Sequence, residues 1–403
     1  MLSTIHSGEM MQIYLDYSAT TPPRLEVITK VQEILRHQWG NPSSLHTWGQ
    51  RTATIVETAR CQVASLINAP NVDSIIFTSG GTEADNLALW GIAKQYSTPE
   101  HLIISSVEHS AISETARLLN QRGWQVTTLS VNHQGRVNPL ELKEAIRPNT
   151  VLVSTIYGQS EVGTIQPIKE LAQIARSSGT LFHTDAVQVA GRLALDVQSL
   201  GVDLLSLSGH KIYGIQGAGA LYVRPGVEIS SLLGGGGQER GLRSGTQSVP
   251  AIAGLGVAAE LAASEMQEET PRLTRLRDHL FDLMADCPYL IPTGDRLHRL
   301  PHHVSFIVTD PSSNDNREQI TGQTIVRQLN LAGIGISAGS ACNSGKLSPS
   351  PILLAMGYSR KEGLGGIRLT LGRGITLEDT EWTAIVLKQI LDRLMQPLVL
   401  VIR

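Results

Sequence analysis

The sequence predicts an α/β protein whose mostly parallel sheet is covered by helices on both faces. Three observations support this prediction. Between residues 75 and 223, seven short apolar runs alternate with helical patterns, as in β-α-β units. The chain has 403 residues, too many for one ordinary core. Four consecutive glycines at 234–237 then interrupt the pattern before a long helical segment.

The chain opens with a short apolar piece at 13–15, a helical pattern at 25–38 and a second one at 50–67. The expected strands of the sheet are 75–78, 102–105, 125–129, 151–155, 181–184, 204–207 and 220–223. Helical patterns lie between most of them, at 83–96, 110–121, 139–146 and 168–177. Ligands bind at the carboxyl ends of strands in such sheets, so the loops that follow these strands are the place to look for a site.

A long helical segment at about 250–285 leads into the last part of the chain. That part contains expected strands near 304–308, 334–336 and 367–371, and helices near 323–330, 349–356 and 377–395. We therefore expect a large domain over residues 12–260 and a smaller α+β domain over residues 261–403. The N-terminal segment is a candidate for completing the small domain.

Composition excludes several classes of protein. Hydrophobic residues make up 41% and charged residues 17%, as in globular proteins, and the net charge of -3 comes without a long basic run. Nucleic acid or anionic membranes are therefore not expected as partners. No apolar run reaches the roughly 18 residues that span a membrane, and the first residues lack a signal-peptide pattern. Three scattered cysteines form neither a disulfide framework nor a CxxC metal pattern, and they suit a reducing cytoplasm.

The expected strand at 75–78 runs into a helix through small residues, Thr-Ser-Gly-Gly-Thr at 78–82. Small side chains let the backbone approach an anion, and the free N–H groups of a first helical turn favour a phosphate. A plain helix start with Ser79 or Thr82 as its N-cap explains the same residues. No Gly-Lys-Ser/Thr follows, so this is not a Walker A loop.

Two further strand ends carry ionisable residues. Asp185 follows the apolar run at 181–184, and a buried aspartate at that position needs a partner. It either pairs with a protonated ring nitrogen or caps a short following helix. His109 follows the strand at 102–105. It either stacks on a flat ring or moves protons, or it is an ordinary loop histidine whose hydrogen bonds are satisfied.

Lys211 lies in the stretch Ser-Leu-Ser-Gly-His-Lys-Ile-Tyr-Gly at 206–214, directly after an apolar run. A lysine at a strand end is held in place, and its neighbours can lower the pKa of its amine so that it attacks a carbonyl. The alternative is a solvated surface charge, which is the state of most lysines.

Cys342 lies in a loop of small residues, Ser-Ala-Gly-Ser-Ala-Cys-Asn-Ser-Gly at 337–345. Such a loop predicts an accessible thiol, whereas the usual state of a free cysteine is burial. The flanking glycine and serine residues argue against burial in a core.

Together these strand ends supply a phosphate cradle, a ring-stacking histidine, an acid for a ring nitrogen and a lysine for an aldehyde. That set describes a site for pyridoxal 5′-phosphate (PLP). In this interpretation Asp185 keeps the pyridine nitrogen protonated, while Lys211 holds the aldehyde and moves protons.

The chain resembles class I cysteine desulfurases of the nitrogen-fixation and iron–sulfur-assembly type. The matching stretches follow the family order over nearly the whole chain. They are YLDYSATTP at 14–22, GNPSS at 40–44, FTSGGTEADN at 77–86, EH at 108–109, HTDAVQ at 183–188, SLSGHKIYG at 206–214, ERGLRSGT at 239–246, SAC at 340–342, IR at 367–368 and LGR at 371–373. The resemblance implies the fold type I architecture of PLP-dependent class-V aminotransferases and a homodimer.

The resemblance also implies which residues bind the cofactor. They are Gly81, Thr82, His109, Asp185, Gln188, Ser208, His210, Lys211 and, reaching the phosphate of the other subunit's site, Thr246. Among them, His109 would stack on the ring, Asp185 would pair with its nitrogen and Gln188 would contact its hydroxyl.

The implied activity is the removal of sulfur from L-cysteine, which gives L-alanine and a persulfide on Cys342. Lys211 and His109 would be the other catalytic residues, and Asn41 with Arg368 would hold the substrate carboxylate. The sulfur would pass to iron–sulfur cluster assembly or to another acceptor protein. No metal is expected in the site.

Two alternatives stay open at this point. Gln159 and Ser160 replace an Asn-Asn pair of the family, whose second member contacts the ring hydroxyl, and the shorter serine suggests a weakened, PLP-binding paralogue. A selenocysteine lyase or cystine C–S lyase on the same fold is the other alternative. Cys342 argues against it, because a lyase needs no acceptor thiol.

Overall fold

The computed structural model describes residues 12–309, 320–339 and 348–395. Contacts within the chain divide it into two compact units. The large unit contains Thr20–Thr270 and Gly294–Leu300, and the small unit contains the described residues of Met1–Ala19, Pro271–Thr293 and Pro301–Arg403. The domain limits expected from the sequence stay a prediction.

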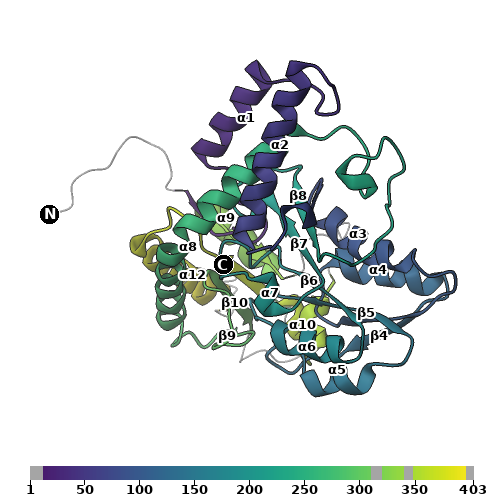
Figure 1. Ribbon diagram of the computed structural model, residues 1–403. Helices are drawn as coiled ribbons and strands as arrows, with labels where there is room; N and C mark the ends of the chain where they lie inside the picture. Colours follow the sequence, from purple (N-terminus) through teal and green to yellow (C-terminus); the bar gives the residue numbers. More distant parts are fainter. Residues whose placement is uncertain (1–11, 310–319, 340–347, 396–403) are drawn as a thin grey trace, which may run out of the picture. The chain divides into compact units, whose positions relative to one another are not determined.

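The large unit is built on one seven-stranded sheet (Figure 1). Its strand order is β2-β8-β7-β6-β5-β3-β4, with β2 Ile75–Thr78, β3 His101–Ser105, β4 Gln125–Leu129, β5 Thr150–Ile156, β6 Leu181–Asp185, β7 Leu204–Ser208 and β8 Gly219–Val223. The five strands from β7 to β4 are parallel, and β8 is antiparallel to both of its neighbours. This confirms the predicted mostly parallel sheet. β8 runs the other way because only a short loop without a crossover helix follows β7.

Apolar side chains cover both faces of this sheet, which explains why its strands are continuous apolar runs in the sequence. On β8, Tyr222 points into one core and Leu221 into the other. The first core includes residues of α2, α5, α6 and α8, and the second includes residues of α3 and α4. The helices of the large unit are α1 Leu25–His37, α2 Thr47–Leu66, α3 Gly81–Ala93, α4 Ser110–Gln121, α5 Pro139–Ala145, α6 Ile168–Ser177, α7 Val197–Leu200 and the first part of α8 Val249–Leu283.

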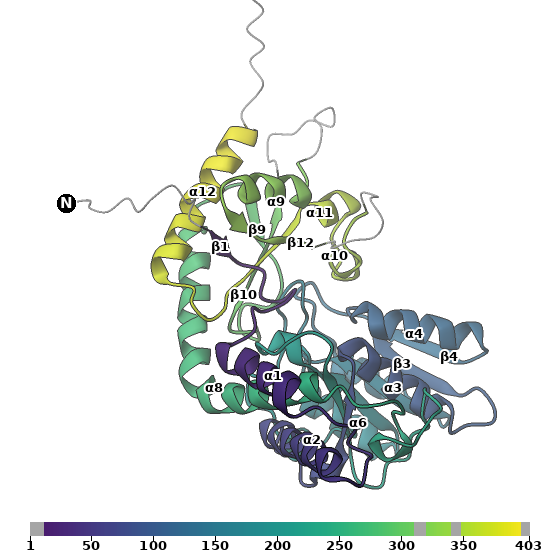
Figure 2. The same cartoon turned by 90° about the horizontal axis from the view of Figure 1, so that it is seen from above.

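The small unit contains a four-stranded antiparallel sheet in the order β12-β13-β10-β9. Its strands are β9 Leu290–Pro292, β10 His303–Val308, β12 Ser337–Ala338 and β13 Gly366–Thr370. Near the start of the chain, β1 Ile13–Tyr14 pairs in parallel with β11 Ile334–Gly335. The helices are α9 Gly322–Leu331, which packs against β12 and β13 (Figure 2), α10 Pro351–Ala355, α11 Arg360–Leu364 and α12 Leu377–Met395.

Among the described residues, α8 is the one helix that is long and apolar enough to cross a membrane. Half of its most apolar window is buried in the protein, and residues such as Ala251, Leu255 and Ala259 belong to the core of the large unit. A core helix passes the same test of length and composition, so this helix is no argument for a membrane span.

The loop at 234–246 is anchored by a buried ion pair. The Glu239 carboxylate accepts hydrogen bonds from Arg60 at 2.8 and 3.0 Å, from the Phe77 backbone N–H at 2.8 Å and from Gln247 at 3.1 Å. Only 3% and 1% of the Arg60 and Glu239 side chains are exposed. Glu239 and Arg240 both have positive φ, at 48° and 57°, a conformation that persists in non-glycine residues only where the surroundings hold it.

Arg60→Ala should destabilise the protein by about 3–5 kcal/mol, because it leaves the Glu239 charge buried and uncompensated. Urea unfolding followed by circular dichroism would measure this. The matched control is Glu57→Ala. The Glu57 side chain also pairs with Arg60 but is 57% exposed, so this substitution should destabilise the protein by less than about 1 kcal/mol. Equal effects of the two substitutions would show that the buried pair does not hold the loop.

Candidate active site

The candidate site lies at the carboxyl ends of neighbouring strands of the large unit. Asp185 is the last residue of β6 and Ser208 is the last residue of β7. The two strands are parallel, with Asp185 directly opposite Ser206. Lys211 follows in a single turn of 3₁₀ helix, Gly209–Lys211. The predicted acid, hydroxyl and lysine are thus placed at one edge of the sheet, where parallel sheets bind ligands.

The start of α3 packs against the end of β7. A Cβ atom added to Gly81 would lie 2.9 Å from Val187 Cγ2 and 3.4 Å from Ser208 Cβ, so the helix can approach this closely only with a glycine there. The Ser208 hydroxyl is buried and has no hydrogen-bond partner in the described part of the chain. A helix N-terminus beside an orphaned hydroxyl fits a bound phosphate group, and Thr82 is exposed beside it.

Asp185 is a buried acid that needs a cation. Its Oδ1 accepts a hydrogen bond from the Val187 backbone N–H at 2.9 Å. Burial raises the pKa of Asp185, whereas the nearby His109 and Lys211 lower it. A protonated pyridine nitrogen would supply the missing partner charge. The residues present therefore fit both the phosphate and the ring of PLP.

His109 caps the N-terminus of α4. Its Nδ1 accepts a hydrogen bond from the Ala111 backbone N–H at 3.2 Å. The residue is exposed on the protein surface of the large unit. The structure shows a histidine that caps a helix, and its stacking on a ring stays a prediction.

The loop that carries the lysine is held by residues from near the start of the large unit. Thr21 donates from its backbone N–H and its hydroxyl to the His210 carbonyl oxygen at 3.0 and 2.8 Å, and Thr21 Oγ1 accepts from the Tyr213 N–H at 2.8 Å. Thr20 Oγ1 lies 3.1 Å from His210 Nδ1. Burial, helped by Lys211, lowers the pKa of His210 to about 4, so this imidazole is neutral. Thr20 and Thr21 belong to the stretch YLDYSATTP at 14–22, but nothing in that stretch indicates a contact with a loop about 190 residues away.

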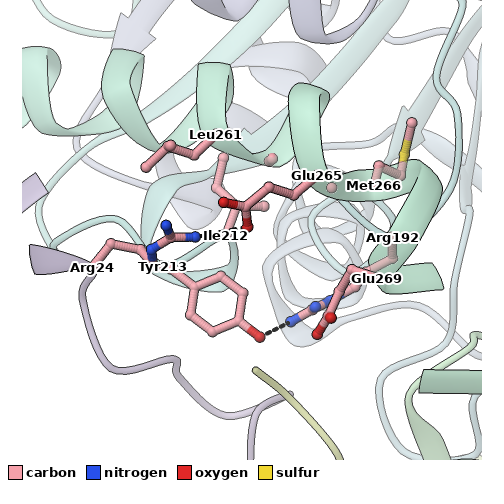
Figure 3. A pocket seen from close by; sticks show the side chains of 10 residues that line it. Arg24, Arg192, Ile212, Tyr213, Leu261, Glu265, Met266 and Glu269 are labelled. Carbon is pink, nitrogen blue, oxygen red and sulfur yellow. Dashed lines mark hydrogen bonds and ion pairs between the residues drawn. The ribbon is translucent and has the colours of Figure 1, made fainter. Parts of the chain in front are cut away.

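Beside the end of this loop lies a small cavity of about 30 Å³, lined by both charged and apolar side chains (Figure 3). Tyr213 lines this cavity and has a backbone φ of 65°. Its hydroxyl accepts a hydrogen bond from Arg192 at 3.2 Å, and the Arg192 guanidinium lies 5.1 Å from the centre of the tyrosine ring. Arg24 donates to Glu265 at 2.8 Å. The cavity has room for about one water molecule. The contacts of Tyr213 with Arg192 hold the residues that follow Lys211.

Gln159 organises the turn in which the sequence departs from the family. Its side-chain oxygen accepts from the Val162 N–H at 2.9 Å, and its nitrogen donates to the Val107 carbonyl at 3.4 Å. Ser160, the shorter residue of the pair, is half-buried, and Gln188 is buried after β6. Gln159 thus holds an ordered turn after β5.

The remaining predicted residues are on other segments of the chain. In the large unit, Thr246 is exposed, and Asn41 is exposed with its Oδ1 accepting from the Ser43 N–H at 2.9 Å. In the small unit, Arg368 is buried on β13 and donates to Asp16 Oδ1 at 2.8 Å. Asp16 Oδ2 accepts from the Ser337 hydroxyl at 2.8 Å. Cys342 lies outside the described residues.

Comparison with known proteins identifies the family of this chain. The family model for class-V aminotransferases matches residues 13–382. The chain is 43% identical to the cysteine desulfurase IscS of Dictyoglomus turgidum over 95% of both chains. It superimposes on a solved NifS-like protein with a TM-score of 0.86 at 33% identity, over 95% of this chain and 100% of the other. A structure of SspA in complex with cysteine gives a TM-score of 0.78 at 34% identity, over 89% and 98% of the two chains.

The chain therefore belongs to the aminotransferase class-V family, whose cysteine desulfurases use PLP. Among the members of this family it is homologous to the cysteine desulfurases over nearly its full length.

Glu108 makes protein stability depend on pH. Burial raises its pKa to about 8, against an ordinary value of 4.5, although its Oε1 accepts from the Ile156 N–H at 2.9 Å. The folded protein keeps this proton between those two pH values while the unfolded chain releases it. Stability should therefore fall as pH rises through that window, and Glu108→Gln should remove up to about 1.4 kcal/mol of this loss per pH unit.

Urea unfolding of the wild type and of Glu108→Gln across this window would measure the difference. Glu114→Gln, at a side chain that is 61% exposed, is the control and should follow the wild type. Parallel pH profiles of the wild type and Glu108→Gln would contradict a buried, protonated Glu108.

Proposed function

We propose that this protein is a cysteine desulfurase that converts L-cysteine to L-alanine and leaves the sulfur as a persulfide on Cys342. The observation that carries the proposal is the meeting of three groups at adjacent strand ends of the large unit: the buried Asp185 carboxyl, the orphaned Ser208 hydroxyl and Lys211. Relatives that are 40–43% identical over nearly the whole chain are cysteine desulfurases.

In this proposal the large unit holds PLP. Gly81, Thr82, Ser208 and His210 bind the phosphate, and the neutral His210 can donate its single N–H. His109 stacks on the ring, Asp185 pairs with the ring nitrogen and Gln188 contacts the ring hydroxyl. Bound PLP supplies an electron sink that stabilises negative charge on the substrate carbons next to the amino group.

The residues of the chain do the rest of the reaction. Lys211 would hold the cofactor through its aldehyde and would move a proton at the substrate α-carbon. The Cys342 thiolate attacks the substrate sulfur, and an S–S bond forms as the C–S bond breaks. The electron pair of the C–S bond stays with the carbon fragment, which takes up a proton and leaves as L-alanine.

The substrate carboxylate is assigned to Arg368 and Asn41. Arg368 is suited to this role, because a guanidinium binds a carboxylate through two parallel hydrogen bonds. The contact with Asp16 Oδ1 at 2.8 Å fixes its Nη2 and orients the planar group. Asp16 is therefore a candidate for positioning the arginine in the small unit.

We also propose that the protein works as a homodimer in which Thr246 reaches the phosphate of the partner's site. Large apolar side chains gather on the surface of residues 25–48, where Leu25 is 74% and Leu45 is 91% exposed. The others are Ile28, Leu35, Trp39 and Trp48. Monomers rarely expose so much apolar surface in one segment. The persulfide would then pass to an acceptor protein in the cytoplasm, such as one that assembles iron–sulfur clusters.

The experiment that tests the activity is an assay of alanine and sulfide with L-cysteine and a thiol reductant. Selenocysteine and cystine, run as separate substrates, test for a lyase. Alanine formation with L-cysteine at a rate far above that of free PLP would support the proposal. A rate equal to that of free PLP would favour the weakened paralogue instead.

Cys342→Ala should bind L-cysteine, as judged by a change in the visible absorption of the bound cofactor, yet should form no persulfide. Alkylation followed by mass spectrometry of the wild type should find the extra sulfur on Cys342. Cys61→Ala, which changes an exposed cysteine of α2, is the control and should keep the persulfide. Full turnover in Cys342→Ala would rule out its role as the acceptor.

Lys211→Ala should lose the visible absorption band of the lysine-linked cofactor, because no amine remains at that position to hold the aldehyde. An absorption scan of the purified protein measures this. Lys94→Ala, at the end of α3 where the lysine bonds the Ser231 carbonyl, should keep the band. A band of wild-type position and strength in Lys211→Ala would assign the linkage to another lysine.

A further inference from the structure

A second buried acid lies beside Asp185. Asp85, in the first turns of α3, is 1% exposed, and its Oδ1 makes no hydrogen bond with any described residue. Oxygen atoms of Asp85 and Asp185 and a ring nitrogen of His109 all lie within 4.8 Å of one another. None of the roles assigned above uses Asp85. Burying a carboxyl whose oxygen has no hydrogen bond destabilises the folded protein, so its presence calls for an explanation.

His183 does not supply the charge that Asp85 lacks. Its Nε2 lies 3.7 Å from Asp85 Oδ1, which suggests an ion pair. However, His183 Nδ1 lies 2.8 Å from Ser154 Oγ, and Nε2 lies 2.9 Å from Ser206 Oγ. Burial lowers the pKa of His183 to about 3, so both nitrogens serve hydroxyl groups and the ring is neutral.

The other ionisable groups around Asp85 favour the charge on Asp185. Asp185 has His109 and Lys211 near it and would face the cofactor nitrogen, all of which favour its ionised form. Burial and the charge of Asp185 raise the pKa of Asp85 well above its ordinary value, and Glu108 adds to this, while a hydrogen bond with Ser206 opposes it. Two buried carboxyls within 4.8 Å of one another repel when both are ionised, which favours a proton on one of them.

We infer that Asp85 is a neutral carboxylic acid that directs its proton at the Asp185 carboxylate and thereby positions it for the ring nitrogen. This inference rests on the proposed PLP site. Asp85 acts through Asp185 and is a positioning residue. A hydrogen bond to a charged group inside the protein is stronger than one between neutral groups. Loss of the hydrogen bond from Asp85 should therefore weaken the binding of the ring nitrogen by Asp185.

Three variants test this in the PLP-loaded protein. Asp85→Asn keeps a hydrogen-bond donor of similar size, and Asp85→Ala removes it. The control is Asp203→Asn, which changes another buried carboxyl. Asp203 precedes β7, at the other end of that strand, and pairs with Arg224. Asp85→Ala should bind PLP roughly tenfold more weakly and shift the pH midpoint of its visible band, because one charge-assisted hydrogen bond is lost. Asp85→Asn and Asp203→Asn should stay within about threefold of the wild type.

Infrared spectroscopy at neutral pH tests the protonation state directly, even if Asp85→Ala folds poorly. The C=O stretch of a protonated carboxylic acid should be present in the wild type and weaker in Asp85→Asn, with Glu108 contributing equally to both. Three results would overturn the inference: no such difference, wild-type affinity and spectrum in Asp85→Ala, or Asp85→Asn as defective as Asp85→Ala. None of these readouts needs turnover of L-cysteine, so a failure here is distinguishable from a failure of the proposed activity.

Discussion

The parallel pairing of β6 with β7 is the constraint on which the site depends. Because the two strands are parallel neighbours, Asp185 lies opposite Ser206. The residues that follow β7 therefore lie at the same edge of the sheet as Asp185. An acid thereby becomes the neighbour of a hydroxyl and a lysine that lie more than 20 residues later in the chain. The antiparallel β8 then lets β2 bring the start of α3, with Gly81, against the end of β7.

Burial gives this arrangement its electrostatic character. Asp85, Glu108 and Asp185 are carboxyls in a region with little water, and His183 is an imidazole kept neutral among hydroxyls. In such surroundings a single proton decides which group carries charge, because the free energy of an unpaired buried charge is large. The buried polar groups around the site therefore help it to bind a cationic ring. Separately, the ion pair of Arg60 with Glu239 anchors the loop that leads to Thr246.

Much of the fold was predictable from local patterns. The helices at 110–121, 168–177 and 377–395 coincide with the expected ranges, because amphipathic periodicity and capping residues are properties of short segments. The seven strands were equally visible as apolar runs. Contacts over long sequence separations were not predictable. The hydrogen bonds of Thr21 to the loop of Lys211 and of Arg60 to Glu239 are examples. Neither Thr21 nor Arg60 differs from ordinary residues of its own segment, so the local sequence does not indicate these contacts.

The sequence by itself determined the element types, the identity of Lys211 and Asp185 as candidates, and the family resemblance, because each follows from residue types at fixed spacing. Only the tertiary structure decided that Ser208 has an orphaned hydroxyl, that His210 and His183 are neutral, and that Asp85 lies beside Asp185. Protonation states and orphaned groups depend on burial and on neighbours from other strands. Those neighbours exist only once the chain is folded.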